Sequence, residues 1–465
     1  MSLQKKKLNS SLAAVILTLA WPTMLEQLMQ TAVQYIDTAM VGSLGTQATA
    51  AVGATSTVSW VVGSSIAALG IGFLSFIARA HGAGNREEAR RASAQAALVV
   101  VIVGVLFTAL CLSCANMIPA WMQVDPSIRS ITARYFAILY APMLFRTATT
   151  VFGMVLRSAG DTKTPMKIGV GVNIINVVLN FLMIYPSRTI RIFGLQIPMF
   201  GAGWGVIGAA IASAVAFTVG GICITIVLWR HPDISPRGQT FKPDMEILRP
   251  CMKVALPNML QRFGTSLGYV AFASMVNSIG EVATAAHTIA NTVESAFYIP
   301  GYGMQTAAAT LAGNAYGARD SKKMKELGNM FLPIEVILMI FSGGALFAFA
   351  PALVDIFSDS PEVITLGTTV LRMVALSEPF YGVSIIVEGM MQGVGKTKLP
   401  FIFNIIGMWG IRIVGTYICT QLLDMGLVSA WVCMIAHNML LFCLFLMTYL
   451  SGRWNPLKTL EKANQ

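Results

Sequence analysis

The sequence predicts an all-α polytopic membrane protein with twelve transmembrane helices, arranged as two six-helix lobes that are related by a parallel internal repeat. Three observations predict this fold class: the composition, the spacing of the apolar stretches, and the similarity of the chain to itself at one fixed offset. Of the 465 residues, 55% are hydrophobic and only 11% are charged. Soluble domains carry about 25% charged residues, so the composition excludes an ordinary soluble protein.

Apolar stretches long enough to cross a bilayer recur along the whole chain. A crossing helix needs about 20 mostly apolar residues. The first stretch begins like the apolar part of a signal peptide, but it continues through Trp21 and Pro22 without an obvious small-residue cleavage site, so we expect no cleavable signal. The predicted spans are residues 12–36, 54–78, 93–118, 132–156, 168–185, 203–229, 250–275, 288–312, 329–353, 366–392, 400–421 and 425–450.

The basic residues predict the orientation of these spans. The chain has 32 Lys and Arg against 21 Asp and Glu, a formal net charge of +11. Most of the cations fall in the two tails and in alternate loops, all on one side of the membrane if the N-terminus is cytoplasmic. The positive-inside rule therefore predicts a plasma (inner) membrane protein with both termini in the cytoplasm. The excess charge indicates orientation and contact with anionic membrane lipid, and no nucleic-acid partner.

The third observation is an internal repeat. Shifting the sequence by 235 residues places Pro22 on Pro257 and the run Ala48–Ala51 on the identical run Ala283–Ala286. The same shift lays span 1 on span 7, so an even number of spans separates the copies and both enter the membrane the same way round. One later loop also repeats: Gly160, Thr162, Lys163 and Pro165 fall on Gly395, Thr397, Lys398 and Pro400.

The repeat predicts the domain organisation. We expect an N-terminal six-helix lobe over residues 1–229, a cytoplasmic linker over 230–249 and a C-terminal six-helix lobe over 250–465. A cavity between two such lobes, opened alternately to each side, is typical of secondary transporters. The alternative is a structural duplication without a central path. The two-lobe design is complete in one chain, so a monomer suffices.

Several short motifs occur in a characteristic order. They are Pro22, the acidic Asp37 within YIDTAMVGSLG, the loop GAGN, and the paired loops SAGDTKTP and GVGKTKLP. In this combination the chain resembles the MATE (multidrug and toxic compound extrusion) family, in its bacterial type, over essentially its whole length. The resemblance implies a V-shaped exporter that expels mostly cationic, amphipathic small molecules in exchange for H⁺ or Na⁺, with no other cofactor.

Two carboxylates lie on the first predicted helix, Glu26 within the span and Asp37 at its outer end. Glu26 and Asp37 are 11 residues apart, so they share a helix face at a separation of about 16 Å. An ionisable residue inside the bilayer costs about 2.5–3.5 kcal/mol, so it indicates a function. The resemblance implies that the carboxylate matching Asp37 takes part in cation coupling. The alternative is that Asp37 sits at the membrane interface and only caps a helix or pairs.

Prolines mark the expected kinks. Pro22, and its repeat partner Pro257, each remove a backbone hydrogen bond early in a span. The resemblance implies that the first helix bends during coupling. Glu378 directly precedes Pro379, which predicts a second bendable helix that carries an acid.

Span 5 carries two asparagines one turn apart, Asn176 and Asn180, which face the same way. In DinF-like members of the family an asparagine and then an aspartate occupy this spacing beside the acid of the first helix. Here the second position is Asn180, so Asp37 is the only clear acid of the predicted N-lobe ion site. An amide ligates Na⁺ or orients a carboxyl group, but it carries no proton. Hydrogen bonding between helices is the alternative role.

The C-terminal half carries the remaining intramembrane charges. NorM-like and eukaryotic members of the family place acids on spans 7, 8 and 10. Here span 7 offers Arg262, whereas Glu294 lies on span 8, and Glu378 and Glu388 lie on span 10. These glutamates are the predicted substrate or ion ligands of this half.

The alternative for the same residues is an internal ion pair. Arg262 or Arg412 would then neutralise Glu294 or Glu388 and keep it ionised, outside any proton exchange. Both interpretations stay open at this stage.

Transport is expected to draw on an ion gradient, because the loops are too short for an ATPase domain and no GxxxxGK[ST] motif is present. No His or Cys cluster predicts a metal site, and no nucleophile–base pair predicts an enzyme. Two non-identical lobes give no ring of filter residues, which disfavours a channel. A flippase for lipid-linked saccharides is the alternative function, although it favours more spans and a strongly basic cavity. The sequence does not distinguish H⁺ from Na⁺.

Overall fold

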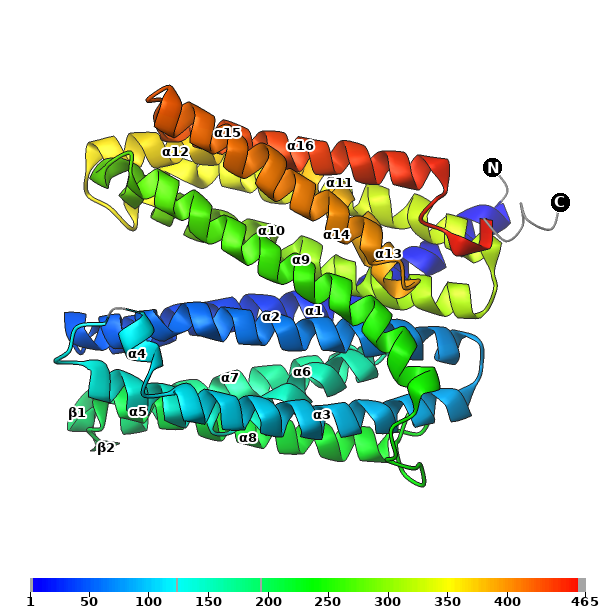
Figure 1. Ribbon diagram of the computed structural model, residues 1–465, viewed down its shortest axis with the longest axis horizontal. Helices are drawn as coiled ribbons and strands as arrows, with labels where there is room; N and C mark the ends of the chain where they lie inside the picture. The colour runs from blue at the N-terminus through cyan, green and yellow to red at the C-terminus, as the bar shows by residue number, and fades with distance from the viewer. Residues whose placement is uncertain (1–2, 123, 193–194, 459–465) are drawn as a thin grey trace. The chain divides into compact units, whose positions relative to one another are not determined.

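Almost the whole chain is helical in the computed structural model, which describes residues 3–122, 124–192 and 195–458 (Figure 1). The elements of the N-terminal half are α1 (Leu3–Gly42), α2 (Thr46–Gly82), α3 (Arg86–Cys114), α4 (Ile118–Trp121), α5 (Arg129–Tyr140), α6 (Met143–Ser158), α7 (Lys163–Met183), β1 (Pro186–Ile192), β2 (Leu195–Ala202) and α8 (Gly205–Arg230). The two strands form an antiparallel hairpin that the sequence did not predict.

The C-terminal half follows the same plan. Its elements are α9 (Met245–Asn277), α10 (Glu281–Gly317), α11 (Ser321–Asp355), α12 (Pro361–Ala375), α13 (Glu378–Gly393), α14 (Lys398–Ile405), the π-helical segment η1 (Ile406–Ile413), α15 (Val414–Tyr417), the π-helical segment η2 (Ile418–Leu422) and α16 (Leu427–Ser451). Segments α14 to η2 follow one another without a break and occupy the predicted eleventh span.

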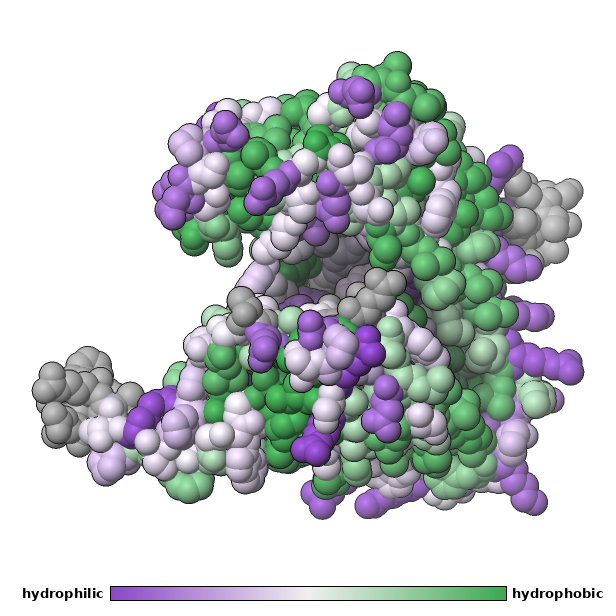
Figure 2. Space-filling model, turned by 60° about the vertical axis from the view of Figure 1, so that its left-hand side comes forward, coloured by the Kyte–Doolittle hydropathy of each residue, from purple (hydrophilic) through white to green (hydrophobic). Residues whose placement is uncertain are grey.

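The long helices coincide with the predicted spans. Among the described residues, eight helices are long and apolar enough to cross a membrane, and two bent helix pairs raise this number to ten. Helices α9 and α10, of 33 and 37 residues, occupy the other two predicted spans. Large apolar side chains such as Leu106 and Phe341 are 62% and 75% exposed. Figure 2 shows the resulting broad hydrophobic areas, with hydrophilic side chains gathered along the margin at the right of the view. Lipid is the solvent that such a surface requires.

Two spans are broken at equivalent places in the repeat. Helices α5 and α6 meet at an angle of 46°, and α12 and α13 meet at 53°. The second bend lies at Glu378 and Pro379, where the sequence predicted a kink. The first residues of α6 and α13, Met143 and Glu378, are 235 residues apart, so the bend belongs to the repeated fold and not to one proline.

Contacts divide the described chain into two compact units, called the N-unit and the C-unit. The N-unit comprises Leu25–Phe73 and Arg86–Leu248, and the C-unit comprises Met1–Met24, Leu74–Asn85 and Arg249–Gln465. Helix α1 runs unbroken through Pro22, and its residues pass from the C-unit to the N-unit two residues later. The inner core of the C-unit packs Ile16 and Ala20 of α1 against α10, α11, α13 and α16.

Within the C-unit, the ends of α2 and α10 cross at two glycines. A Cβ atom built on Gly82 would lie 2.0 Å from the carbonyl oxygen of Asn314, and one built on Gly317 would lie 1.9 Å from that of Arg79. The 235-residue shift exchanges these two contacts, because it places Gly82 on Gly317 and Arg79 on Asn314. The repeat therefore produces a reciprocal crossing that has no room for a side chain on either helix.

We expect Gly82→Ala and Gly317→Ala each to destabilise the protein, because the added methyl group forces the two backbones apart. Overpacking of this kind costs about 1–3 kcal/mol. The measurement is the melting temperature of the purified protein in detergent. Gly53→Ala, also on α2, is the matched control, because nothing lies within 4 Å of its added Cβ. Equal melting temperatures for the Gly82 and Gly53 variants would contradict the close crossing.

The central linker is an ordered strap that follows the first turns of α3. Gln95, 1% exposed, donates to the carbonyl oxygen of Lys242 at 2.8 Å and accepts from the amide of Asp244 at 3.0 Å. The Asp244 carboxylate also lies 2.5 Å from the Arg91 guanidinium. The side-chain amide of Gln95 thus pairs with the linker backbone as a neighbouring strand would, and fixes the chain up to the start of α9.

Candidate functional site

The predicted ion site of the N-terminal half is assembled within the N-unit. Asp37 lies on α1, close to the end at Gly42, and its side chain is half-buried. Asn180 of α7, 1% exposed, donates to Asp37 Oδ1 at 2.6 Å and to Asn176 Oδ1 at 3.2 Å. The one-turn spacing of the two asparagines thus places both on the face of α7 that meets α1.

Asn176 extends the network to a third helix. Its Nδ2 lies 2.9 Å from the Ser213 hydroxyl of α8. Exchanging its amide nitrogen and oxygen would place the nitrogen 2.9 and 3.2 Å from the two oxygens of Asp37, and the oxygen would accept from Ser213. Amide orientation is assigned from such networks. In either orientation Asp37 receives amide donors from α7, and the site joins α1, α7 and α8.

Asp37 has no ion-pair partner within 4 Å in the part of the chain that the structure describes. Burial disfavours the ionised carboxyl group, whereas amide donors favour it. A half-buried carboxylate with neutral donors can exchange a proton, Na⁺ or an organic cation, because no fixed cation of the protein competes for it.

Glu26, the second acid of α1, is placed differently. Its carboxylate forms an ion pair with the Arg157 guanidinium of α6, and the two side chains are 12% and 8% exposed. A Cβ atom built on Gly169 of α7 would lie 3.2 Å from Glu26 Cγ, so α7 covers the pair. Arg157 lies in the last turn of α6, one residue beyond the predicted fourth span. This buried pair neutralises Glu26.

A polar cluster surrounds Glu388 in the C-unit. Gln261 of α9 and Gln392 of α13 donate to its Oε1 at 2.8 and 3.2 Å. Asn404 of α14 lies 3.3 Å from its Oε2. Arg262, one residue after Gln261, is turned back along its own helix and donates to Asn258 at 2.9 Å. Glu388 is therefore held by three neutral amides from three helices.

Arg412 also forms no ion pair among the described residues. Its guanidinium lies over the rings of Phe272 and Tyr269, 4.3 and 4.8 Å from their centroids, and one nitrogen is 3.0 Å from the sulfur of Met434. Glu294 of α10, 7% exposed, has no salt bridge within 4 Å either. The pairing alternative for Arg262 and Arg412 is thus not realised in this conformation.

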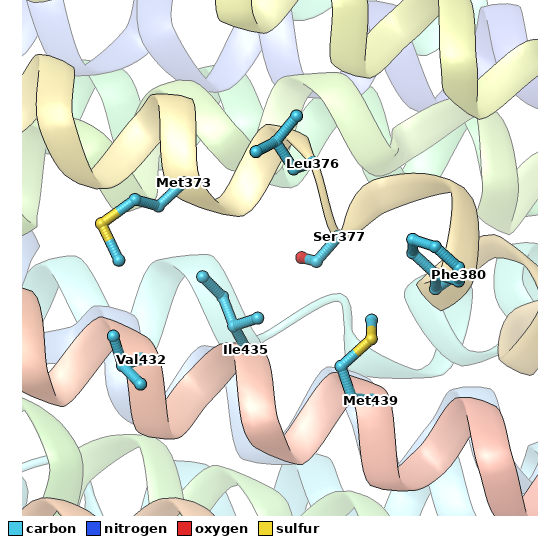
Figure 3. Close-up of a pocket in the computed structure, with 7 residues that line it drawn as sticks. All are labelled: Met373, Leu376, Ser377, Phe380, Val432, Ile435 and Met439. Carbon is cyan, nitrogen blue, oxygen red and sulfur yellow. The ribbon is translucent and has the colours of Figure 1, made fainter.

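Glu378 lies at the bend between α12 and α13. It is 2% exposed, and its Oε2 has no hydrogen-bond partner within the described part of the chain. A groove of about 350 Å³ lies beside this bend, between α12, α13 and α16, and Figure 3 shows the side chains that line it. Apart from Ser377 its walls are apolar: Met373, Leu376, Phe380, Val432, Ile435 and Met439. The bend therefore brings a buried acid within one residue of an apolar, exposed groove.

Sequence reasoning missed several members of these clusters. Ser213, Arg157 and Asn404 are brought in by the packing of helices distant in sequence, and no local pattern marks them. Glu335 of α11 was visible as an intramembrane acid but was not singled out.

The prolines Pro22 and Pro257 lie inside unbroken helices.

Comparison with known proteins adds to this geometry. A family model described as MatE matches the chain twice, over residues 22–182 and 257–418. The two matches begin 235 residues apart, which is the offset of the internal repeat. The two-lobe repeat that the sequence predicted is therefore a property of the family.

Similar sequences and structures agree with this match. The "Probable multidrug resistance protein NorM" of Thermotoga maritima is 27% identical over 447 residues, which cover 96% of this chain and 94% of that protein. The "Probable multidrug resistance protein YoeA" of Bacillus subtilis is 24% identical over 440 residues, with 92% and 91% covered. A solved outward-facing conformation of a multidrug resistance MATE family transporter has a TM-score of 0.88, with 25% identity, and 96% and 97% of the two chains covered. The predicted fold class is confirmed, and the chain belongs to the MATE family of multi-pass membrane transporters.

Proposed function

We propose that this protein is a cation-coupled antiporter, which exports small amphipathic cations from a prokaryotic cytoplasm in exchange for H⁺ or Na⁺. The relatives named as multidrug resistance proteins support efflux as the class of activity. The internal repeat supports alternating access between the two halves. In this proposal the protein works as a monomer in the inner membrane, with both termini in the cytoplasm.

The observation that carries the proposal is the environment of Asp37. Its carboxyl group lies inside a membrane span, has two amide-bearing side chains beside it, and has no protein cation within 4 Å among the described residues. A bound proton, Na⁺ or organic cation would each neutralise the same carboxylate, so their binding is mutually exclusive. Mutually exclusive binding at one group is the physical basis of antiport.

Glu388 gives the C-unit a comparable group. Neutral amides hold its carboxylate, as they hold that of Asp37, and a nearby arginine bonds elsewhere. One half would then bind the coupling ion, and the other would contribute to the charge of the substrate path. Glu294 and Glu378 are further buried carboxyl groups of the same unit.

The test is efflux from proteoliposomes loaded with a fluorescent lipophilic cation, with H⁺ and Na⁺ gradients imposed separately. We expect efflux above the rate of protein-free vesicles under at least one gradient, and its abolition by an ionophore that collapses that gradient. Gradient-independent efflux would contradict coupling. If no lipophilic cation moves under either gradient while a fluorescent lipid-linked saccharide changes leaflet, the protein is a flippase and the proposal is wrong.

A further inference from the structure

A buried carboxyl group outside the two amide-lined sites occupies the middle of the C-unit. Glu335 lies on α11, and its side chain is 0% exposed. A Cβ atom built on Gly301 of α10 would lie 2.8 Å from Glu335 Oε1, and one built on Gly382 of α13 would lie 3.2 Å from the same oxygen. The absence of side chains at these two glycines creates the space that the carboxyl group fills between three helices.

Both oxygens of Glu335 are buried, and neither has a hydrogen-bond partner among the residues that the structure describes. Besides Glu335 itself, the atoms closest to these two glycines belong to Met339 and Ile385, which are apolar side chains. An isolated carboxylate in such surroundings is unstable by many kcal/mol, and a carboxyl group avoids this cost by binding a proton. Glu335 is therefore a neutral acid in this conformation.

The charged and titratable side chains of the helices packed against α11 give Glu335 no counter-ion. These groups are Glu281, His287, Glu294, Tyr298, Tyr302 and Tyr316 on α10, Glu362 and Arg372 on α12, Glu378, Tyr381 and Glu388 on α13, and Cys433, His437, Cys443 and Tyr449 on α16. The cation among them, Arg372, points to the carbonyl oxygen of Phe347 at 3.4 Å and over its ring.

The ligand of this site is a proton and not a metal ion. Hard cations need several oxygen ligands, whereas the neighbours of Glu335 offer glycine backbone, a thioether and an aliphatic chain. Within the described part of the chain, no group of three or more His, Cys, Asp and Glu residues could hold a metal ion.

We propose that Glu335 is a second proton-binding site of this transporter, whose proton is exchanged only when the contact between α10, α11 and α13 opens. The proposal rests on the antiport function proposed above and adds a coupling group in the half opposite Asp37. The bend between α12 and α13 lies one turn before Gly382, so a change of that bend would move one wall of the site. The rate of proton exchange at Glu335 would then depend on the conformation of the C-unit.

The first test detects the proton directly. Infrared difference spectroscopy separates the C=O stretch of a protonated carboxylic acid from the bands of a carboxylate. We expect wild type to show this band at neutral pH and Glu335→Gln to lack one component of it. Glu326→Gln, on the same helix but partly exposed, is the control and should match wild type. An unchanged band in Glu335→Gln would overturn the proposal. Glutamine is nearly isosteric and neutral, so the variant should fold.

The second test asks whether the proton moves. Protons released on addition of tetraphenylphosphonium to purified protein in weak buffer are counted with a pH indicator. We expect Glu335→Gln to release about one proton fewer per protein than wild type, and Glu326→Gln to release the same number. A lost infrared band with an unchanged proton count would make Glu335 a static acid and overturn the exchange. If wild-type efflux needs no ion gradient, the antiport function fails instead, whatever the infrared result.

Discussion

Replacing Asp37 by asparagine should reduce the rate of gradient-driven efflux at least about tenfold. A tenfold change corresponds to a free-energy difference of about 1.4 kcal/mol. The amide keeps the size of the side chain and can still bond Asn180, but it carries neither a charge nor an exchangeable proton. The coupling ion and the substrate would then have no common site for which to compete. The measurement is dye efflux from proteoliposomes under the gradient that drives wild type.

The matched control for this substitution is Asp125→Asn, in the loop between α4 and α5. Hydrogen bonds from the side chain and the amide of Ser127 hold the pKa of the Asp125 carboxyl below its ordinary value of 3.8. Asp125 therefore stays ionised at every pH used for transport and exchanges no proton. We expect its variant to transport like wild type. Full coupling in the Asp37 variant would instead move the ion site to Glu388.

The positions of the spans could be predicted from the sequence, because the thickness of the bilayer sets the length of an apolar stretch. No tertiary information is needed for this. The one-turn spacing also predicted that Asn176 and Asn180 share one helix face, whereas their position beside Asp37 was implied by the resemblance to DinF-like members of the family. Because the second position is asparagine and not aspartate, Asp37 is the single carboxylate of this cluster with Asn176 and Asn180, as expected.

The break between α5 and α6 was not predictable in the same way. Residues 132–156 read as one apolar stretch, because a bend of 46° changes the path of a span but not its composition. Its counterpart at Glu378 was predicted from Pro379, and Pro142 stands at the first break in the same way but was not used. The repeat offset connects the two, so comparing the halves would have transferred the bend from one to the other.

The partners of the buried arginines could not be predicted from local sequence patterns. Arg262 and Arg412 were equal candidates for pairing with the C-unit glutamates, but one is held by Asn258 and the other lies over aromatic rings. Arg157, one residue beyond the predicted fourth span, does pair with a buried acid. These choices depend on which helix faces meet, and sequence spacing within one helix carries no such information.

The pair between Glu26 and Arg157 yields the second large expected effect. Removing one partner of a buried ion pair leaves an uncompensated charge and costs about 3–5 kcal/mol. We therefore expect Arg157→Met to lower the melting temperature of the purified protein sharply, because Glu26 has only 12% of its side chain exposed. In the complementary variant Glu26→Gln, Arg157 would lose its carboxylate partner. The contact of Arg157 with the sulfur of Met154, at 3.9 Å, is too weak to replace that carboxylate.

A double-mutant comparison separates lost pairing from lost packing. Replacing both residues by neutral side chains removes both charges, and such exchanges are often neutral or stabilising, so Glu26→Gln with Arg157→Met should be more stable than Arg157→Met alone. The exposed pair Arg86–Asp233 is the contrast: Arg86 is 73% exposed, and Asp233→Asn should cost about 0–1 kcal/mol. If the Arg157 variant melts like the Asp233 variant, water reaches Glu26 in the folded protein. In that case Glu26 returns as a candidate ion ligand, eleven residues before Asp37 on the same face of α1.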